Sequence, residues 1–459
     1  MARSTAIVWL RRDLRVHDNP SLARAASACE RVVPAFVLDP AILGGRFASG
    51  PRTAFLLGCL RALDDELRER GSGLVVRLGA PEQELPALAR ETGAREVRWA
   101  RDATPYAIAR DARVAAALAN AGAEPVPGPG TFVVDDLTEV RTRAGGPFAV
   151  FSPFQRAWSA LERRPLERAP RALAPLPSRL RRGSIPSLAV LARELGGGRL
   201  RDRLAGEPAV APGELTARRA LSRWVASGLD GYAGRRDELA GAGASRLSAH
   251  LRFGALSPRE VERRARDRGG AGADAFVRQL AWRDFLAHVM LHHPGDARSE
   301  HQPRMRTLAW VDDPRALAAW QDGRTGFPLV DAAMRQLRAS GWMPNRARLV
   351  AGSFLTKDLG IDWRAGEAWF MRWLLDGDVA QNNGNWQWIA SVGVDPAPVA
   401  RRILNPALQA RRHDPDGVYV RRWLGADRRH DPPPIVDHAL ARRAALERYA
   451  TLRADSSRL

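Results

Sequence analysis

Four short runs rich in β-branched and aromatic residues mark the first third of the chain, and they constrain its fold more than any other feature. The runs that indicate buried strands are AIVWL (6–10), RVVPAFVL (31–38), LVVRLG (74–79) and EVRWA (96–100). Residues 53–71 and 106–122 carry apolar side chains at helical spacing and end at glycine. Strands that alternate with helices are typical of a parallel, doubly wound α/β sheet. The first strand runs into RRDLRVHDNPSL without a glycine-rich phosphate loop, so no dinucleotide site is predicted there.

The pattern changes further along the chain. Residues 160–213 are rich in proline, arginine and serine, which is typical of a linker. From about residue 214 the apolar spacing becomes helical, and most of the 14 tryptophans lie in this half. We therefore predict an α/β domain over 1–130, a connector over 131–213 and an all-α domain over 214–459.

Composition limits the classes of partner. The formal net charge is +20 and the sequence pI is about 11.3, which favours a polyanionic partner such as nucleic acid. Arginine bias from genome composition would give the same excess. Two cysteines are too few for a disulfide framework or a four-cysteine metal site. No stretch is long and apolar enough for a signal peptide or a membrane span, so we expect a cytoplasmic protein.

Residues 376–391, DGDVAQNNGNWQWIAS, combine two carboxylates, five side-chain amides and two tryptophans between apolar flanks. A buried stretch this polar needs partners. Asn345 and Arg348 are one helical turn apart, and Arg348 could pair with Asp376 or Asp378. The interpretation without a ligand is a structural salt bridge. Amides are poor general acids and bases, which argues against hydrolysis, but they suit the edge of a heterocycle.

Three further segments carry candidate site residues. Ser245, Arg246 and Ser248 stand at a helix start and suit a phosphate, or the serines simply cap helices. Trp282 lies beside a glutamine and an arginine and could form a stacking wall or belong to the core. His288 and His292 have zinc-ligand spacing, but no glutamate follows His288, so we expect an ordinary solvated or capping role and no metal.

Motifs in order along the chain resemble the DNA photolyase/cryptochrome family, most closely its class I cyclobutane pyrimidine dimer photolyases. They are VWLRRDLRVHDNPSL, FSPFQRAW, SRLS, QLAWRDF, TGFPLVDAAMRQL, GWMPNR, SFLTKDL, IDWRAGE, DGDVAQNNGNWQW and the final PPPIVDHALARRAALERY. The resemblance implies an N-terminal antenna domain and a helical domain that binds FAD. It implies light-dependent splitting of pyrimidine dimers by an electron from reduced FAD to a lesion flipped out of the DNA.

The resemblance also implies roles for individual residues. Asn382 is expected opposite flavin N5, and Trp386, Trp363 and Trp310 form an electron relay from the flavin to the surface. The residues expected to bind FAD are Tyr232, Ser245, Arg246, Leu247, Ser248, Gln279, Arg283, Trp342, Asn345, Arg348, Asp376, Asp378 and Asn382. The residues expected to contact the lesion or DNA are Gln279, Trp282, Asn345, Arg346, Leu349, Trp388 and Gln409.

Departures from the family pattern bear on the alternatives. Gln279 stands where many cyclobutane-dimer enzymes carry glutamate, and it is common in cryptochromes and (6-4) photolyases. Asn345 and Leu349 replace the histidine pair of the (6-4) branch, so we favour the cyclobutane dimer. A cryptochrome photoreceptor is the non-enzyme alternative, and the absence of a long tail after the last helix favours repair. Tyr106 and Ala107 replace the Asn–Glu pair of folate-binding members, so a deazaflavin is the preferred antenna. We expect a monomer.

Overall fold

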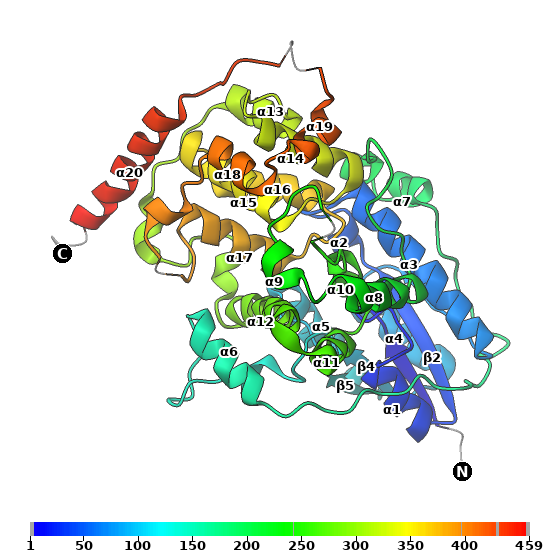
Figure 1. The fold of residues 1–459 in the computed structure, drawn as a ribbon. Helices are drawn as coiled ribbons and strands as arrows, with labels where there is room; N and C mark the ends of the chain where they lie inside the picture. Colours follow the sequence, from blue (N-terminus) through cyan, green and yellow to red (C-terminus); the bar gives the residue numbers. More distant parts are fainter. Residues whose placement is uncertain (1–3, 242, 396, 428–430, 456–459) are drawn as a thin grey trace. The chain divides into compact units, whose positions relative to one another are not determined.

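The computed structural model describes residues 4–241, 243–395, 397–427 and 431–455, and the chain divides into two compact units (Figure 1). Unit 1 comprises Met1–Arg203, Val210–Asp230 and Ser245–His292. Unit 2 comprises Leu204–Ala209, Gly231–Ala244 and His293–Leu459. The predicted domain boundaries at 130 and 213 stay a prediction.

Unit 1 is built on a five-stranded parallel sheet, with the order β3-β2-β1-β4-β5. The strands are β1 (Thr5–Trp9), β2 (Arg31–Leu38), β3 (Val75–Leu78), β4 (Glu96–Ala100) and β5 (Glu124–Gly128). Ile7 pairs with Val33 on one side and with Val97 on the other, so β1 is central. This order reverses at β1, as in doubly wound folds, and the predicted α/β class is confirmed.

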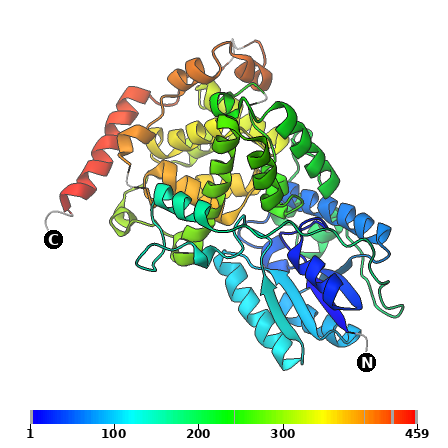
Figure 2. The same ribbon diagram turned by 60° about the horizontal axis from the view of Figure 1, so that its bottom comes forward.

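The helices of unit 1 include those that cover this sheet. They are α1 (Pro20–Ala28), α2 (Pro40–Leu43), α3 (Gly50–Glu69), α4 (Pro81–Thr92), α5 (Pro105–Asn120), η1 (Leu137–Glu139), α6 (Phe151–Ala160), α7 (Leu188–Glu194), η2 (Gly198–Arg201), α8 (Glu214–Ser227), α10 (Ser248–Phe253), α11 (Pro258–Arg268) and α12 (Gly270–His292). Leu85 and Leu88 of α4 and Val114 of α5 share a buried cluster with Ile7 and Val97 of the sheet. Figure 2 shows the strands and these helices from a second direction.

Unit 2 is helical in its described residues. Its elements are α9 (Tyr232–Arg235), η3 (Pro294–Ala297), η4 (Pro303–Thr307), α13 (Pro314–Asp322), α14 (Pro328–Ser340), α15 (Asn345–Ser353), the π-helical turn η5 (Phe354–Asp358), α16 (Trp363–Trp373), α17 (Val379–Ala390), η6 (Val399–Arg402), α18 (Pro406–His413), α19 (Val418–Leu424) and α20 (His438–Asp455). One hydrophobic cluster joins them, with Trp320, Trp363, Trp373 and Trp386 among its buried members. The predicted all-α half is confirmed.

The prediction of a solvated or capping role for His288 is wrong. His288 lies on α12 and is completely buried. Its Nε2 accepts a hydrogen bond from the backbone N–H of Phe148 (3.0 Å), and its Nδ1 lies 3.2 Å from the carbonyl oxygen of Leu137. Segments more than a hundred residues earlier in the chain therefore cover this helical face, which the local pattern of α12 does not reveal.

No described helix is both long enough and apolar enough to cross a membrane. Residues 4–241, 243–395, 397–427 and 431–455 contain no group of three or more histidine, cysteine, aspartate or glutamate side chains that could hold a metal ion.

Candidate functional site

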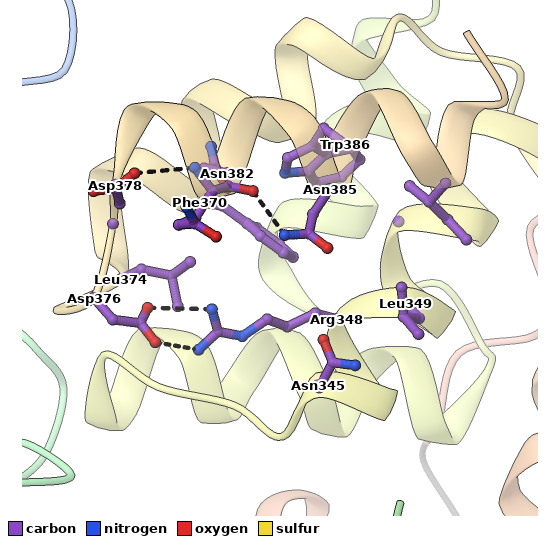
Figure 3. A pocket seen from close by; sticks show the side chains of 14 residues that line it. Asn345, Arg348, Leu349, Phe370, Leu374, Asp376, Asp378, Asn382, Asn385 and Trp386 are labelled. Carbon is purple, nitrogen blue, oxygen red and sulfur yellow. Dashed lines mark hydrogen bonds and ion pairs between the residues drawn. The ribbon is translucent and has the colours of Figure 1, made fainter. Parts of the chain in front are cut away.

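A cleft in unit 2 brings together seven of the predicted site residues. It has about 530 Å³ of empty space, part of it open to solvent, between α15, α16 and α17. Asn345, Arg348 and Leu349 line it from α15, and Trp386 and Asn382 line it from α17 (Figure 3). The remaining two are Asp376 and Asp378, from the segment that joins α16 to α17.

Arg348 and Asp376 form the predicted arginine–carboxylate pair. Arg348 Nη1 lies 3.2 Å from Asp376 Oδ1, and Nη2 lies 2.8 Å from Oδ2 (Figure 3). Arg348 Nε also donates to the carbonyl oxygen of Met343 at 3.1 Å. Two parallel charge-assisted hydrogen bonds fix the plane of the guanidinium. The pair therefore ties α15 to the segment before α17 at the edge of the cleft.

Asp378 has a different role from Asp376. It is the N-cap of α17, and its Oδ1 accepts a hydrogen bond from Gln381 N at 3.0 Å. A capping carboxylate satisfies an otherwise free N–H and favours the positive end of the helix dipole. This cap fixes where α17 begins, and thus the positions of Asn382 and Trp386 on it.

Of the five side-chain amides in residues 376–391, two bond to other parts of the protein and three line the cleft. Asn383 Nδ2 donates to Glu367 Oε1 (3.1 Å), and Gln387 Nε2 donates to Asn383 Oδ1 (3.1 Å) and to the carbonyl oxygens of Asp296 and Ser299. These two amides are buried and serve the internal network. Asn382, Gln381 and Asn385 line the cleft instead. Asn382 Nδ2 donates to the carbonyl oxygen of Glu367 at 3.0 Å, which leaves its side-chain oxygen as an acceptor.

Trp386 forms part of the cleft wall. Its ring meets Phe370 edge-on at 4.9 Å between centroids and Trp320 at 6.2 Å. Its Nε1 is buried and has no hydrogen-bond partner among the described residues. A Cβ at Gly366 of α16 would lie 2.1 Å from Trp386 Cη2, so only glycine permits this approach. Trp386 is therefore held against α16, whose first residue is Trp363.

The other predicted relay residues belong to the same part of unit 2. Trp363 is completely buried, and Trp310 packs partly buried against the same hydrophobic cluster as Trp386. Val311 N donates to the carbonyl oxygen of Gly360 at 2.9 Å, which joins the Trp310 segment to the turn before α16. The structure thus gathers the three tryptophans, while their role as a relay stays a prediction.

Several predicted contacts of unit 2 lie outside the cleft lining. Arg346 Nη2 pairs with Asp237 Oδ2 at 2.7 Å, and Nη1 lies 3.5 Å from Gln409 Oε1. Trp388 Nε1 donates to Asp395 Oδ2 at 2.8 Å, and the Arg402 guanidinium lies 4.5 Å from the Trp388 ring centroid. The remaining two are Trp342, which is buried, and Tyr232, whose pKa burial raises to about 12.

The predicted residues of unit 1 lie in two places, at the start of α10 and on α12. Ser245 Oγ accepts from Leu247 N at 3.4 Å, Arg246 has a φ of 55°, and Ser248 begins α10. On α12, Gln279 precedes Trp282, which stacks on Phe151 with ring centroids 3.8 Å apart and an interplanar angle of 7°. Arg283 Nη2 donates to the carbonyl oxygen of Thr131 at 3.0 Å. Their participation in one site with the cleft of unit 2 stays a prediction.

Sequence reasoning missed the residues that support this site. Glu367 accepts from Asn383, Phe370 packs on Trp386, and Asp395 with Arg402 holds Trp388. A glutamate on the apolar stripe of a helix is an available signal, and Glu367 stands one turn after Trp363. The partners of Trp388 give no such local signal.

A partly apolar cleft with a few converging polar groups, in the helical unit of a chain that also has a doubly wound α/β unit, is typical of a cofactor-binding protein. Residues 6–174 match the family model described as DNA photolyase, and residues 276–431 match the FAD binding domain of DNA photolyase. The chain belongs to the DNA photolyase family.

Relatives match over nearly the whole chain. The deoxyribodipyrimidine photo-lyase of Streptomyces griseus is 41% identical over 96% of this chain and 98% of its own length. Among solved structures, a bacterial class III photolyase from Agrobacterium tumefaciens gives a TM-score of 0.89 at 32% identity, covering 99% of this chain and 98% of its own. A cryptochrome from Synechocystis gives 0.86 at 27% identity, covering 97% and 99%.

The cleft residues fit a flavin. The cleft opens to solvent and is lined by both polar and apolar side chains. The fixed Arg348 guanidinium and the Asn382 oxygen offer a cationic donor and an acceptor beside the apolar walls of Phe370 and Trp386. Such a set suits a flat heterocycle that carries both donors and acceptors.

Proposed function

We propose that this protein is a light-dependent DNA repair enzyme that splits cyclobutane pyrimidine dimers with the help of FAD. The observation that carries the proposal is the cleft of unit 2, where an arginine–aspartate pair, an amide and a buried indole converge inside a matched FAD-binding domain. The family membership and the names of the curated relatives support the substrate class. We expect a cytoplasmic location, where the DNA substrate would be accessible. We also expect the protein to act as a monomer.

FAD, when bound and reduced, supplies the photoexcited electron that opens the cyclobutane ring. The chain's own residues hold and tune it. Arg348, fixed by Asp376, provides a positive charge in a fixed orientation. Asn382 provides a neutral acceptor, since its amide nitrogen is already bound to the carbonyl oxygen of Glu367. An uncharged acceptor can meet an N–H of the reduced ring without adding a negative charge.

Three tryptophans are proposed to return the cofactor to its reduced state. Trp386 lines the cleft, Trp363 is completely buried in the same hydrophobic cluster, and Trp310 packs against that cluster and is partly exposed. An indole gives up one electron more readily than an aliphatic side chain, so a connected set can carry an electron inward from the surface. Their membership of one cluster and the partial exposure of Trp310 support this assignment.

The lesion is proposed to leave the duplex and stack on Trp388 of unit 2, with Asn345, Arg346, Leu349 and Gln409 of the same unit as its further contacts. Gln279 and Trp282 of unit 1 stay predicted contacts. Trp388 is prepared for stacking because Asp395 holds its N–H and Arg402 backs its ring. Base stacking on an aromatic face contributes about 1–3 kcal/mol per base. The phosphates of FAD are assigned to Tyr232 and the 245–248 segment, and the remaining cofactor contacts to Arg283 and Trp342.

The two alternatives to repair of the cyclobutane dimer are repair of the (6-4) photoproduct and a photoreceptor role without repair. Asn345 and Leu349 stand where the (6-4) branch has histidines, and neither side chain can supply a proton. A cryptochrome without repair activity shares the fold, as the Synechocystis structure illustrates. An antenna chromophore in unit 1 is also proposed, with a deazaflavin favoured over folate. Tyr106, at the position of the folate-binding pair, instead donates to Asp39 Oδ2 at 2.5 Å.

The test is a repair assay with chemically reduced protein and an oligonucleotide that carries one thymine dimer. Blue light should restore thymine absorbance, while the dark sample and a (6-4) oligonucleotide should show no change. Photoreduction of the flavin without any restoration would support the cryptochrome alternative and reject the proposal. Restoration with the (6-4) substrate alone would reassign the lesion.

A further inference from the structure

A buried carboxylate contacts the middle tryptophan of the proposed relay. Trp363 Nε1 donates a hydrogen bond to Glu300 Oε1 at 3.2 Å, and the Glu300 side chain is 4% exposed. Glu300 precedes the 3₁₀ turn η4, whereas Trp363 opens α16, so the contact joins two separate segments of unit 2. Glu300 lies outside the sequence motifs that indicated the site.

The two buried tryptophans of the relay therefore have unlike surroundings. Trp363 has a carboxylate on its N–H, whereas Trp386 Nε1 has no partner among the described residues and its ring faces Phe370 and Trp320. An indole that has lost an electron is a cation. A neighbouring negative charge stabilises a cation, and an apolar environment does not.

We infer that Glu300 is a positioning residue that makes the transfer of an electron from Trp363 to oxidised Trp386 energetically favourable. This inference rests on the proposed function, because it presupposes the relay. In the step, one electron leaves the Trp363 ring and fills the vacancy on Trp386. Trp386 becomes neutral, Trp363 becomes the cation, and no bond forms or breaks. The proton on Trp363 Nε1 stays in its hydrogen bond to Glu300.

Arg364 explains why the proton stays on the indole. Arg364 Nη2 pairs with Glu300 Oε2 at 2.7 Å, and Nη1 lies 3.1 Å from Asp362 Oδ2. Burial alone would raise the pKa of Glu300, but the hydrogen bond and charge of Arg364 bring that pKa below its ordinary value. A weaker base is a poorer acceptor of the indole proton. The vacancy on Trp363 therefore stays mobile and can be filled next from Trp310.

Arg364 also lies over the Trp363 ring, with its guanidinium carbon 4.7 Å from the ring centroid. A lone cation there would oppose the loss of an electron from Trp363. Glu300 and Asp362 both pair with this guanidinium, so much of its charge is compensated. Removing the charge of Glu300 alone should thus act twice on Trp363, by deleting the anion and by exposing the cation.

The test is Glu300→Gln, which keeps the shape and an acceptor for the indole but deletes the charge. In flash photolysis of the oxidised, flavin-loaded protein, the yield of long-lived oxidised tryptophan should fall by about tenfold or more, the effect expected from losing a charged hydrogen-bond partner. Asp322→Asn, which removes an exposed carboxylate of α13, is the matched control and should match the wild type. An unchanged yield in Glu300→Gln would overturn the inference.

Two further samples separate this inference from the proposed function. If Trp386→Phe abolishes photoreduction while Glu300→Gln leaves it intact, the relay stands and the role of Glu300 is wrong. If Trp386→Phe has no effect, the relay itself is wrong.

Arg364→Gln should raise the basicity of Glu300 and give the neutral tryptophan radical in place of the cation, which the transient absorption spectrum distinguishes. The cation spectrum in that variant would overturn the role given to Arg364.

A measurement without flavin tests the contact itself. In the apoprotein, the indole N–H band of Trp363 in the ultraviolet resonance Raman spectrum, isolated by subtracting Trp363→Phe, should show a strong hydrogen bond. Glu300→Leu should shift it to the position of a free indole, and Glu300→Gln should place it between the two. An identical band in all three proteins would contradict the contact.

Discussion

At the scale of single residues, the site depends on one glycine. Gly366 lets the edge of Trp386 rest on α16, and a Cβ there would lie 2.1 Å from Trp386 Cη2 and 2.6 Å from Leu355 Cδ2. We expect Gly366→Ala to displace Trp386, to destabilise the protein by about 1–3 kcal/mol through overpacking, and to lower the flavin content of the purified protein. Urea unfolding and the ratio of flavin to protein absorbance measure the two effects.

Gly295→Ala is the matched control, since a Cβ at Gly295 meets no atom within 4 Å. It should leave both the unfolding free energy and the flavin content close to those of the wild type. Normal flavin content in Gly366→Ala would mean that the position of Trp386 does not shape the cofactor site.

Residues of the site differ in how far their neighbours could be predicted from sequence. Arg348, Asp376 and Asp378 lie in short polar motifs, and the arginine–aspartate pair was predicted from them and is confirmed. The stacking of Trp282 on Phe151 and the contact of Trp363 with Glu300 join segments far apart in the chain. No local pattern encodes such contacts, because they arise only when the helices pack.

At the scale of elements, the strands with near-continuous apolar runs were predicted almost to the residue, and β2 and β4 have the predicted bounds. β5 was missed because EPVPG contains two prolines, which cannot donate hydrogen bonds. In the described sheet it is an edge strand next to β4, and proline is tolerated there. α4 was also missed, and it contains Pro86 in its first turns. In both elements, tertiary contacts outweighed the low strand or helix propensity of proline.

The docking of α8 in unit 1 gives a prediction about pH. Glu214, the first residue of α8, accepts from Val16 N at 2.6 Å and from His17 N at 3.0 Å. Burial raises the pKa of Glu214 to about 7, against the lowering effect of these two N–H groups. The folded protein therefore keeps this proton at pH values where the unfolded chain, with an ordinary glutamate pKa of about 4.3, has lost it.

Because the native state holds the extra proton, the contribution of Glu214 to stability is complete below about pH 4.3 and is lost as the pH rises to about 7. Across this pH window, we expect the unfolding free energy of the wild type to fall by up to about 3 kcal/mol relative to that of Glu214→Gln. Urea unfolding of both proteins at pH 4.5, 6 and 7.5 measures it. A constant difference would show that the carboxyl group is ionised throughout.

At the scale of the whole molecule, the net charge of +20 should dominate affinity for DNA, while stacking should decide the preference for a lesion. Phosphate contacts release counterions, so we expect affinity for undamaged and damaged duplexes to fall together, by at least about tenfold between 50 and 200 mM salt. Stacking releases no counterions, and the ratio of the two affinities should stay nearly constant. Fluorescence anisotropy with matched oligonucleotides measures both quantities.

Trp388→Ala separates the two contributions. Loss of one stacking face should lower the affinity for the damaged duplex by about 1–3 kcal/mol and leave the slope against salt unchanged. Trp423→Ala is the matched control, because it also deletes a partly buried indole that packs on the hydrophobic cluster of unit 2 but lies outside the proposed lesion site. If the lesion preference itself collapsed with salt, or if both variants weakened it equally, electrostatics or general stability rather than the Trp388 ring would account for damage recognition.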